Sequence, residues 1–209
     1  MTARPSIAVL DYGIGNLRSA QKGLERAGAD AHLTADPDEV AAVDGVVLPG
    51  VGNFGRCVEA LHARGVDAMA KDAAASGRPF LGICVGMQLL YEGSDESPDL
   101  PGLGVLPGTV RLLPDTVKRP QMQWNAISVT SPSPLLDGLD GAWLYFVHSY
   151  AADPAAAPET VVATCDYGGP VVAAVQQGNV FATQCHPEKS SDAGRHLLAN
   201  FVDLCRTAT

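Results

Sequence analysis

The sequence predicts an α/β fold in which a mostly parallel central sheet is flanked by helices and gains antiparallel strands in its second half. In the first half of the chain, short apolar runs that end at Gly or Pro alternate with helical patterns, which is typical of a parallel sheet covered by helices. In the second half, strand-like runs follow one another across short turns, which favours antiparallel pairing. The 209 residues can bury roughly 70% of the surface of the unfolded chain, so we expect residues 1–209 to form a single domain.

The first half predicts four strands with helices between them. Each strand is a short, largely apolar run near Gly, Pro or charged residues, and each helix carries apolar residues at helical spacing. The expected strands are Ser6–Leu10, Ala31–Thr34, Gly45–Leu48 and Phe80–Ile83. The expected helices are Asn16–Ala27, Pro37–Ala42, residues 54–76 and Met87–Tyr91. We expect Gly28 to end the first of these helices and Gly65 to break the third.

The second half predicts six strands and a final helix. The expected strands are Val105–Leu113, Trp124–Val129, Trp143–Tyr150, Thr160–Cys165, Val171–Gln177 and Val180–Cys185. The final helix, Ser191–Arg206, has Leu197, Phe201 and Leu204 at helical spacing. The Pro- and Ala-rich stretch Ala151–Pro158 is expected to be a loop.

The charge balance and the lack of a long apolar run argue against two classes of partner. Lys and Arg number 14 against 23 Asp and Glu, for a formal net charge of -9. Non-specific nucleic-acid binding needs clustered cations to displace counterions from phosphate, so we expect no nucleic-acid partner. We expect no membrane partner either, because no run approaches the ~20 apolar residues of a membrane-spanning helix.

The cysteines and the N-terminus indicate a cytoplasmic protein. The five cysteines are odd in number and widely spaced, which argues against a disulfide scaffold and against a zinc site. The apolar run Ile7–Leu10 near the N-terminus is too short for a signal peptide.

Residues 50–55 read GVGNFG, which matches the G-x-G-x-x-G pattern of dinucleotide-binding proteins. That pattern also needs an acidic residue ~20 positions later, at the end of the next strand. The nearest candidate, Asp72, lies within a helical pattern. We therefore expect no nucleotide cofactor, and we expect this turn to present backbone N–H groups to an anion.

The strongest catalytic signal is Gly82-Ile83-Cys84-Val85-Gly86. It is the cysteine form of G-x-S-x-G, a sharp strand-to-helix turn that exposes a nucleophile at the carboxyl edge of a sheet. The N-terminus of the following helix stabilises a thiolate. Cys84 is therefore the candidate nucleophile, whereas the other four cysteines are expected to be buried core residues.

A thiol nucleophile needs an imidazole to move its proton, and His186 is the best candidate. Pro187 forces it into extended geometry, which places Glu188 on the same side and within reach of the ring. His32, His62 and His196 have no acidic residue at a spacing that would orient the ring. His148 lies in the apolar run YFVHSY, where a satisfied core histidine is expected.

These motifs resemble those of the class I, or triad, glutamine amidotransferases, in which a GICVGMQLL-like segment precedes an HPEKS-like one. Three further stretches are DYGIGNLRS from Asp11, LPGVGNFG from Leu48 and YFVHSY from Tyr145. They are similar to the glutaminase subunits of imidazole glycerol phosphate synthases, and the similarity runs nearly from end to end.

The resemblance implies a role for each matching residue. Cys84 attacks the side-chain amide of L-glutamine, His186 is first base and then acid, and Glu188 orients His186. The oxyanion is bound by backbone N–H groups of Val85 and of the segment Gly50, Val51 and Gly52. The substrate is held by Gln88, Glu92, Ser149 and Tyr150.

The resemblance also implies a partner, a (β/α)₈-barrel cyclase that receives ammonia and makes imidazole glycerol phosphate in histidine biosynthesis. It implies no metal and no organic cofactor. It further implies that glutamine turnover is slow until the partner binds. The glycines of residues 50–52 offer a device for this, because they permit a peptide to turn between two orientations.

The chain departs from the family pattern at a few positions. Gln121 and Gln123 stand where His and Gly are expected, Cys185 replaces Phe and Val85 replaces Leu. The first two affect the partner-facing segment, and none removes a catalytic group.

Three alternatives remain at this point. The chain could be the glutaminase subunit of another synthase, such as that of pyridoxal phosphate or anthranilate, although DYGIGNL and YFVHSY argue against this. It could also be a cysteine hydrolase of related fold that does not act on glutamine. The third alternative, a binding subunit without activity, is disfavoured by intact Cys84, His186 and Glu188.

Overall fold

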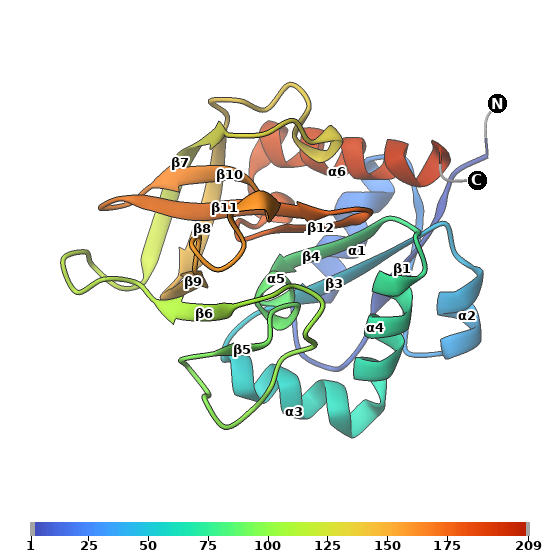
Figure 1. Ribbon diagram of the computed structural model, residues 1–209. Coiled ribbons are helices and arrows are strands. Elements are labelled where there is room, and N and C mark those ends of the chain that lie inside the picture. The colour runs from blue at the N-terminus through green and yellow to red at the C-terminus, as the bar shows by residue number, and fades with distance from the viewer. Residues whose placement is uncertain (1–2, 208–209) are drawn as a thin grey trace.

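The computed structural model describes residues 3–207, and its largest element is a mixed sheet (Figure 1). The strands of this sheet are β1 (Ser6–Leu10), β2 (Asp30–Thr34), β3 (Gly45–Gly50), β4 (Phe80–Cys84), β7 (Gln121–Val129), β8 (Trp143–His148), β10 (Val161–Asp166), β11 (Pro170–Gln177) and β12 (Val180–Thr183). Their order across the sheet is β2-β1-β3-β4-β12-β11-β10-β7-β8. The pairings from β2 to β12 are all parallel, and those from β12 to β8 are all antiparallel. The expected fold class, a parallel sheet with antiparallel additions, is confirmed.

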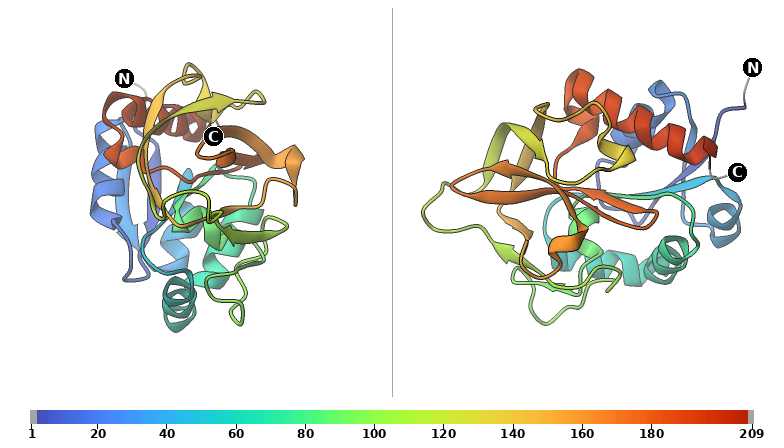
Figure 2. Two further views of the ribbon diagram at one scale, coloured as in Figure 1. Left: turned by 90° about the vertical axis from the view of Figure 1, so that its left-hand side faces the viewer. Right: turned by 45° about the horizontal axis from the view of Figure 1, so that its top comes forward.

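The helices cover both faces of the parallel half. They are α1 (Leu17–Arg26), α2 (Pro37–Ala42), α3 (Phe54–Arg64), α4 (Val66–Ala75), α5 (Val85–Leu89) and α6 (Ser191–Thr207). Figure 2 shows α1 and α6 on one face and α3 and α4 on the other. Gly65 breaks α3 from α4 with φ 66°, and Gly28 follows the end of α1 with φ 102°, as the sequence predicts.

A second, smaller sheet was not expected from the sequence. It joins β5 (Gly93–Ser94), β6 (Thr109–Leu112) and β9 (Tyr150–Ala152) in the order β5-β6-β9. The expected strand Trp143–Tyr150 is therefore wrong in one respect, since it divides at Ser149 into strands of two different sheets. The expected loop from Ala151 begins two residues too early, because Ala151 and Ala152 pair with β6 and are buried.

One hydrophobic cluster includes buried residues from β1 through to α6. It contains large side chains such as Phe54, Phe80, Phe146 and Phe201, each with no exposed area. The sheet is therefore anchored from both faces. None of the helices within residues 3–207 combines the length and the apolar character needed to span a bilayer.

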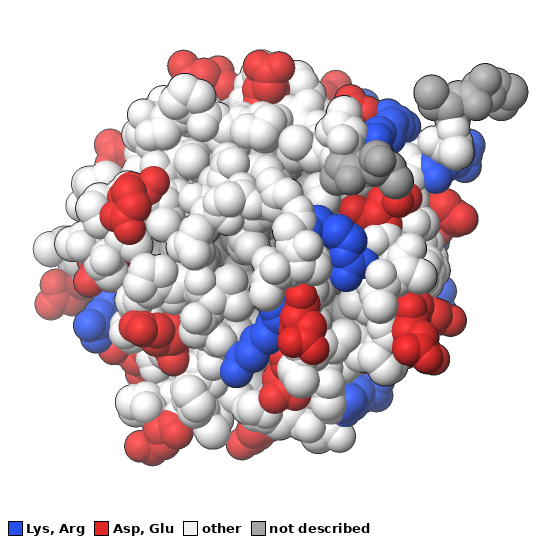
Figure 3. Space-filling view, turned by 45° about the vertical axis from the view of Figure 1, so that its right-hand side comes forward, with Lys and Arg blue, Asp and Glu red and all other residues white. Residues whose placement is uncertain are grey.

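Charged side chains are interspersed on the face shown in Figure 3, where Lys and Arg lie among Asp and Glu and form no continuous basic surface. Such an arrangement gives no electrostatic footprint for a nucleic acid on this face.

Candidate active site

Cys84 lies at the turn between β4 and α5, as the sequence predicts. β4 ends at Cys84 and α5 begins at Val85, with no residue between them. Cys84 has φ 55° and ψ −113°, a conformation that is strained for a residue with a side chain and that is concentrated at functional sites. The turn therefore has the geometry of a nucleophile elbow.

The two glycines around Cys84 are required by close backbone contacts. A Cβ added to Gly86 would lie 1.8 Å from the carbonyl oxygen of Leu48, and one added to Gly82 would lie 3.0 Å from the carbonyl oxygen of Gly86. Any side chain at Gly86 would thus push α5 away from β3. The spacing of glycines two residues before and after Cys84 reflects this packing.

His186 and Glu188 form a buried hydrogen-bonded pair. The distance between His186 Nδ1 and Glu188 Oε1 is 2.8 Å, and each side chain is only 2% exposed. The carboxylate accepts, so Nδ1 carries the proton and Nε2 is available to a thiol. Asn16 Nδ2 donates to the same Glu188 oxygen at 3.2 Å, a contact that sequence reasoning missed.

The electrostatics of the pair stabilise the imidazolium that forms when Nε2 takes up a proton. Burial alone would lower the pKa of His186, but its interactions with Cys84 and Glu188 outweigh burial and raise the pKa to about 9. Burial would raise the pKa of Glu188, yet the hydrogen bond and charge of His186 hold it below its usual value. Cys84, His186 and Glu188 therefore interact as one unit.

A pocket of about 340 Å³ opens onto Cys84 and His186. Most of the expected site residues line it, namely Val51, Gly52, Cys84, Val85, Gln88, Ser149, Tyr150 and His186. Gly50 does not line the pocket, but it pairs with Cys84 across β3 and β4. A Cβ on Gly50 would lie 2.6 Å from the backbone nitrogen of Gly86, so this glycine is needed for the close approach of β3 to α5.

The end of β3 and the residue that follows it are anchored at two carbonyl groups. Tyr12 Oη donates to the Pro49 carbonyl at 2.7 Å, and Cys57 Sγ donates to the Val51 carbonyl at 3.4 Å. Since C=O and N–H point in opposite directions in a trans peptide, the Gly52 N–H points away from Cys57. The peptide between Gly50 and Val51 lies between these two anchored peptides.

This geometry is consistent with comparisons to known proteins. The family model for class I glutamine amidotransferases matches residues 8–205. The chain is 49% identical over 207 residues to the imidazole glycerol phosphate synthase subunit HisH of Halobacterium salinarum, covering 96% of this chain and 94% of that protein. It is 48% identical over 202 residues to the HisH subunit of Deinococcus radiodurans, covering 95% and 94% of the two chains. The chain belongs to the HisH family of class I glutamine amidotransferases. A solved structure with the same fold is PurLQS from Thermotoga maritima, with a TM-score of 0.75 and 21% identity over 96% of this chain and 99% of that one.

In this member of the HisH family, hydrogen bonds to two neighbouring residues hold the Gln88 side chain in place. Its Nε2 donates to the Tyr150 carbonyl at 3.0 Å and to Gln184 Oε1 at 3.1 Å. Gln184 Nε2 in turn lies 3.7 Å from Cys84 Sγ. Sequence reasoning missed Gln184, because nothing within VFATQC distinguishes it from an ordinary strand residue.

Glu92 is not part of this pocket, contrary to expectation. Its side chain is exposed, and Oε2 accepts from the Gly108 N–H at 3.0 Å. The chain after α5 turns outward, so Glu92 serves the loop before β6. Glu96 lines the pocket instead, and its Oε2 accepts from the Phe54 N–H at the start of α3.

His148 also differs from expectation, since only one of its two ring nitrogens has a hydrogen-bond partner among the described residues. Its Nδ1 lies 2.9 Å from the Tyr150 carbonyl, but its buried Nε2 has no hydrogen-bond partner among the described residues. His62 does have an acidic neighbour, Asp67, at 2.7 Å. That pair lies on the surface, with the His62 side chain 54% exposed, and outside the pocket of Cys84.

The other four cysteines are buried, as expected. Cys185 Sγ lies 2.9 Å from Thr183 Oγ1, and burial raises its pKa to about 12. Its thiol is therefore protonated and unreactive at neutral pH, although it adjoins His186. Within residues 3–207, no group of three or more His, Cys, Asp or Glu is arranged to hold a metal ion.

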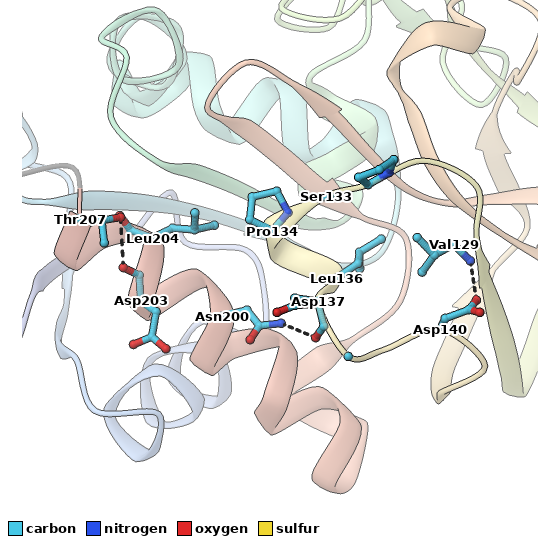
Figure 4. Close-up of a pocket in the computed structure, with 12 residues that line it drawn as sticks. Val129, Ser133, Pro134, Leu136, Asp137, Asp140, Asn200, Asp203, Leu204 and Thr207 are labelled. Carbon is cyan, nitrogen blue, oxygen red and sulfur yellow. Dashed lines mark hydrogen bonds between the residues drawn. The ribbon is translucent and has the colours of Figure 1, made fainter.

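A larger cavity of about 930 Å³ lies on another part of the molecule, between α6 and the loop after β7. Figure 4 shows its lining, which includes Ser133, Leu136, Asp140 and Asn200. It contains none of the expected site residues and no nucleophile with a base beside it. Volume alone therefore does not identify the active site.

Proposed function

We propose that this chain hydrolyses L-glutamine through a thioester on Cys84. Sγ attacks the side-chain carbonyl, and the proton taken up by His186 passes to the departing nitrogen, so ammonia leaves as the C–N bond breaks. Water, activated by His186, then cleaves the thioester to give glutamate and the free thiol. The observation that carries the proposal is the pocket that places the strained Cys84 turn beside the buried pair of His186 and Glu188.

The backbone around Cys84 supplies the other half of the chemistry. The Val85 N–H, at the start of α5, and an N–H of residues 50–52 stabilise the tetrahedral oxyanion. Gln88 and the backbone of Ser149 and Tyr150 hold the substrate. Glu96 takes the role that the resemblance implies for Glu92, because it is the carboxylate that lines the pocket and can pair with the α-ammonium group of glutamine.

The HisH relatives are subunits of imidazole glycerol phosphate synthase, which supports a partner for this chain. That partner is a (β/α)₈-barrel cyclase, which uses the ammonia to make imidazole glycerol phosphate and AICAR in histidine biosynthesis. The two chains form a heterodimer in the cytoplasm. Residues 1–209 act as one glutaminase domain, which the hydrophobic cluster that joins β1 to α6 supports. The proposed reaction requires no metal and no organic cofactor.

One surface next to the pocket is suited to the cyclase. Residues that alternate along a strand share a face, and the pairing of β7 with β8 places six uncharged residues on one such face. We call it the β7–β8 face, and its members are Met122, Trp124, Ala126, Trp143, Tyr145 and Val147. Met122 and Trp143 are each 61% exposed, whereas Val147 reaches the pocket of Cys84. A partner docked here buries apolar surface and encloses the route of ammonia.

Residues 50–52, beside the pocket, offer a control of activity. An oxyanion donor is present only if an N–H of residues 50–52 faces the pocket, and the peptide between Gly50 and Val51 is flanked by anchored peptides that can serve as pivots. Losing one such donor costs on the order of 10²–10³ in rate. The chain alone is therefore expected to turn over glutamine slowly, and the cyclase with its ribonucleotide to raise kcat at least ~100-fold with little change in KM.

Glutamate release from glutamine, measured with and without the cyclase and its ribonucleotide, tests this function. Cys84→Ala is expected to lose about 10⁴-fold in glutaminase activity, while synthesis driven by external ammonia survives because the cyclase chemistry lies in the other chain. No glutamate release by the assembled pair would contradict the proposal. Full activity of the chain alone would contradict the control but leave the hydrolysis in place.

A further inference from the structure

His148 ends β8 beside the catalytic groups. It is 7% exposed and lines the same pocket as Cys84 and His186. Its Nδ1 lies 2.9 Å from the Tyr150 carbonyl. A carbonyl oxygen can only accept, so Nδ1 carries the proton and Nε2 keeps an unshared electron pair. His148 is therefore a hydrogen-bond acceptor at Nε2.

That acceptor has no donor within the described chain. Nε2 is fully buried and has no hydrogen-bond partner among residues 3–207. Buried polar atoms are almost always paired, and an unpaired one in a native site needs an explanation. His148 lines the pocket, so a ligand that seats against it, shifts the atoms over Nε2 and brings an N–H would supply the missing donor.

Glutamine has two nitrogens that carry N–H groups, and the charges in the pocket indicate where each of them binds. The α-ammonium group is positive and is best paired with the carboxylate of Glu96. The side-chain amide nitrogen must lie near His186, because His186 delivers its proton. His148 and His186 line the same pocket, so both rings are available to the amide end of the substrate.

The ring of His148 also stays neutral. Burial lowers its pKa most, the hydrogen bond to the Tyr150 carbonyl raises it and the positive charge of His186 lowers it, and together they bring the pKa to about 4. A carboxylate at this place would stabilise ammonium. A neutral imidazole can bind ammonia through an N–H and still release it as the uncharged nucleophile that a synthase needs.

We propose that His148 Nε2 accepts a hydrogen bond from the leaving nitrogen of glutamine as ammonia forms. The electron pair of the C–N bond goes to nitrogen and the proton comes from His186, so His148 neither gains nor loses a proton. This assignment rests on the proposed glutaminase reaction, and it adds a residue that contacts the departing group.

The experiment compares two substrates that differ only in the leaving group. The leaving group of glutamine is ammonia, which has N–H groups to donate. The leaving group of γ-glutamyl methyl ester is bound through an oxygen that carries no hydrogen of its own. His148→Asn keeps a donor near the position of Nδ1 and removes the acceptor. His148→Gln places a side-chain oxygen near the position of Nε2 and serves as the matched variant. Both are assayed in complex with the cyclase and its ribonucleotide, and kcat/KM is measured because it reports acylation.

We expect His148→Asn to lose about 3- to 10-fold in kcat/KM for glutamine, as befits one neutral hydrogen bond, and to hydrolyse the ester at the wild-type rate. His148→Gln should recover most of the loss. Equal losses on both substrates, or no loss on either, would overturn the proposal, and thermal unfolding of each variant identifies a loss caused by misfolding. Failure of the wild-type complex to hydrolyse glutamine would instead refute the proposed function.

Discussion

Asn16 shows how one side chain can serve the catalytic unit rather than the helix it precedes. It occupies the N-cap position of α1, yet its side chain makes no capping hydrogen bond. Instead it donates to Glu188 Oε1, which also binds His186. The DYGIGNL stretch that contains Asn16 thereby reaches the catalytic residues from the far end of the chain.

Asn16→Ser is expected to affect catalysis more than stability. Asn16 makes no capping hydrogen bond that the substitution could remove, and serine is also accepted at the N-cap, so the free energy of unfolding should change by less than about 0.5 kcal/mol. Its shorter side chain cannot reach Glu188, so kcat should fall about 3- to 10-fold with KM nearly unchanged, as for the loss of one hydrogen bond. Steady-state kinetics and chemical denaturation measure both. A variant with wild-type kcat would show that Glu188 needs no support from α1.

Glu188→Gln tests the charge of the carboxylate through the pH dependence. The substitution keeps the shape but removes a charge that stabilises the imidazolium, so the pKa of His186 should fall from about 9 towards 6.5. The limb of the profile of kcat/KM against pH that reports His186 is expected to move to lower pH by about one unit or more. kcat should fall by less than it does in Cys84→Ala.

Glu188→Gln should also change how the free energy of unfolding depends on pH. The pKa of His186 in the folded protein lies above its usual 6.5, so the stabilisation from its charge is complete below pH 6.5 and is lost as pH rises through 9. Glu188→Gln should flatten this decline in the free energy of unfolding. An unchanged profile in both measurements would reduce Glu188 to a turn residue.

Local motifs could predict the catalytic residues but not all of those around them. Cys84 lies between glycines that the turn requires, and the Pro after His186 sets the path to Glu188. Each of these catalytic residues therefore stands in a recognisable local motif. No local motif identifies Gln184, Glu96 or Asn16, because their roles depend on contacts between distant segments. The resemblance implies Glu92, and the sequence does not show that the chain turns outward after α5 and that Glu96 lines the pocket instead.

At the scale of elements, the elbow depends on how closely α5 lies against β3. Gly86→Ala would place a Cβ 1.8 Å from the Leu48 carbonyl, and backbone on both sides cannot yield cheaply. We expect a loss of at least about 3 kcal/mol in the free energy of unfolding, at the upper end for overpacking. Gly93→Ala is the control, because its Cβ would have no atom within 4 Å. Equal stability of the two variants in chemical denaturation would contradict the packing account.

Most elements were predictable because their periodicity is local. Pro37–Ala42 and the break at Gly65 appear in the structure as the sequence predicts. The strand Trp143–Tyr150 was not predicted to divide, since its apolar pattern runs unbroken while its two halves pair with β7 and β6. The small sheet depends on such long-range pairing, which no short run of residues specifies.

At the scale of the whole molecule, the β7–β8 face connects the pocket to the proposed partner. Met122→Asp would place a charge on this face, and burying an unpaired charge is costly. We expect the dissociation constant for the cyclase to rise at least about 10-fold, with the fold intact because Met122 is exposed. Leu112→Asp, which alters an exposed apolar residue on β6, is the matched control. Equal effects of the two in a binding titration would place the interface elsewhere.

The most direct test of the account is the site at which a glutamine-mimicking electrophile reacts. A chloroketone analogue of glutamine should alkylate Cys84 alone, with loss of chloride, and excess glutamine should prevent the reaction. Peptide mass spectrometry of the labelled complex is expected to find the adduct on the peptide that contains Cys84, and none in Cys84→Ser. The labelled complex should keep synthesis from external ammonia and lose synthesis from glutamine. An adduct on Cys185, with Cys84 unmodified and glutamine-dependent activity lost, would contradict the account.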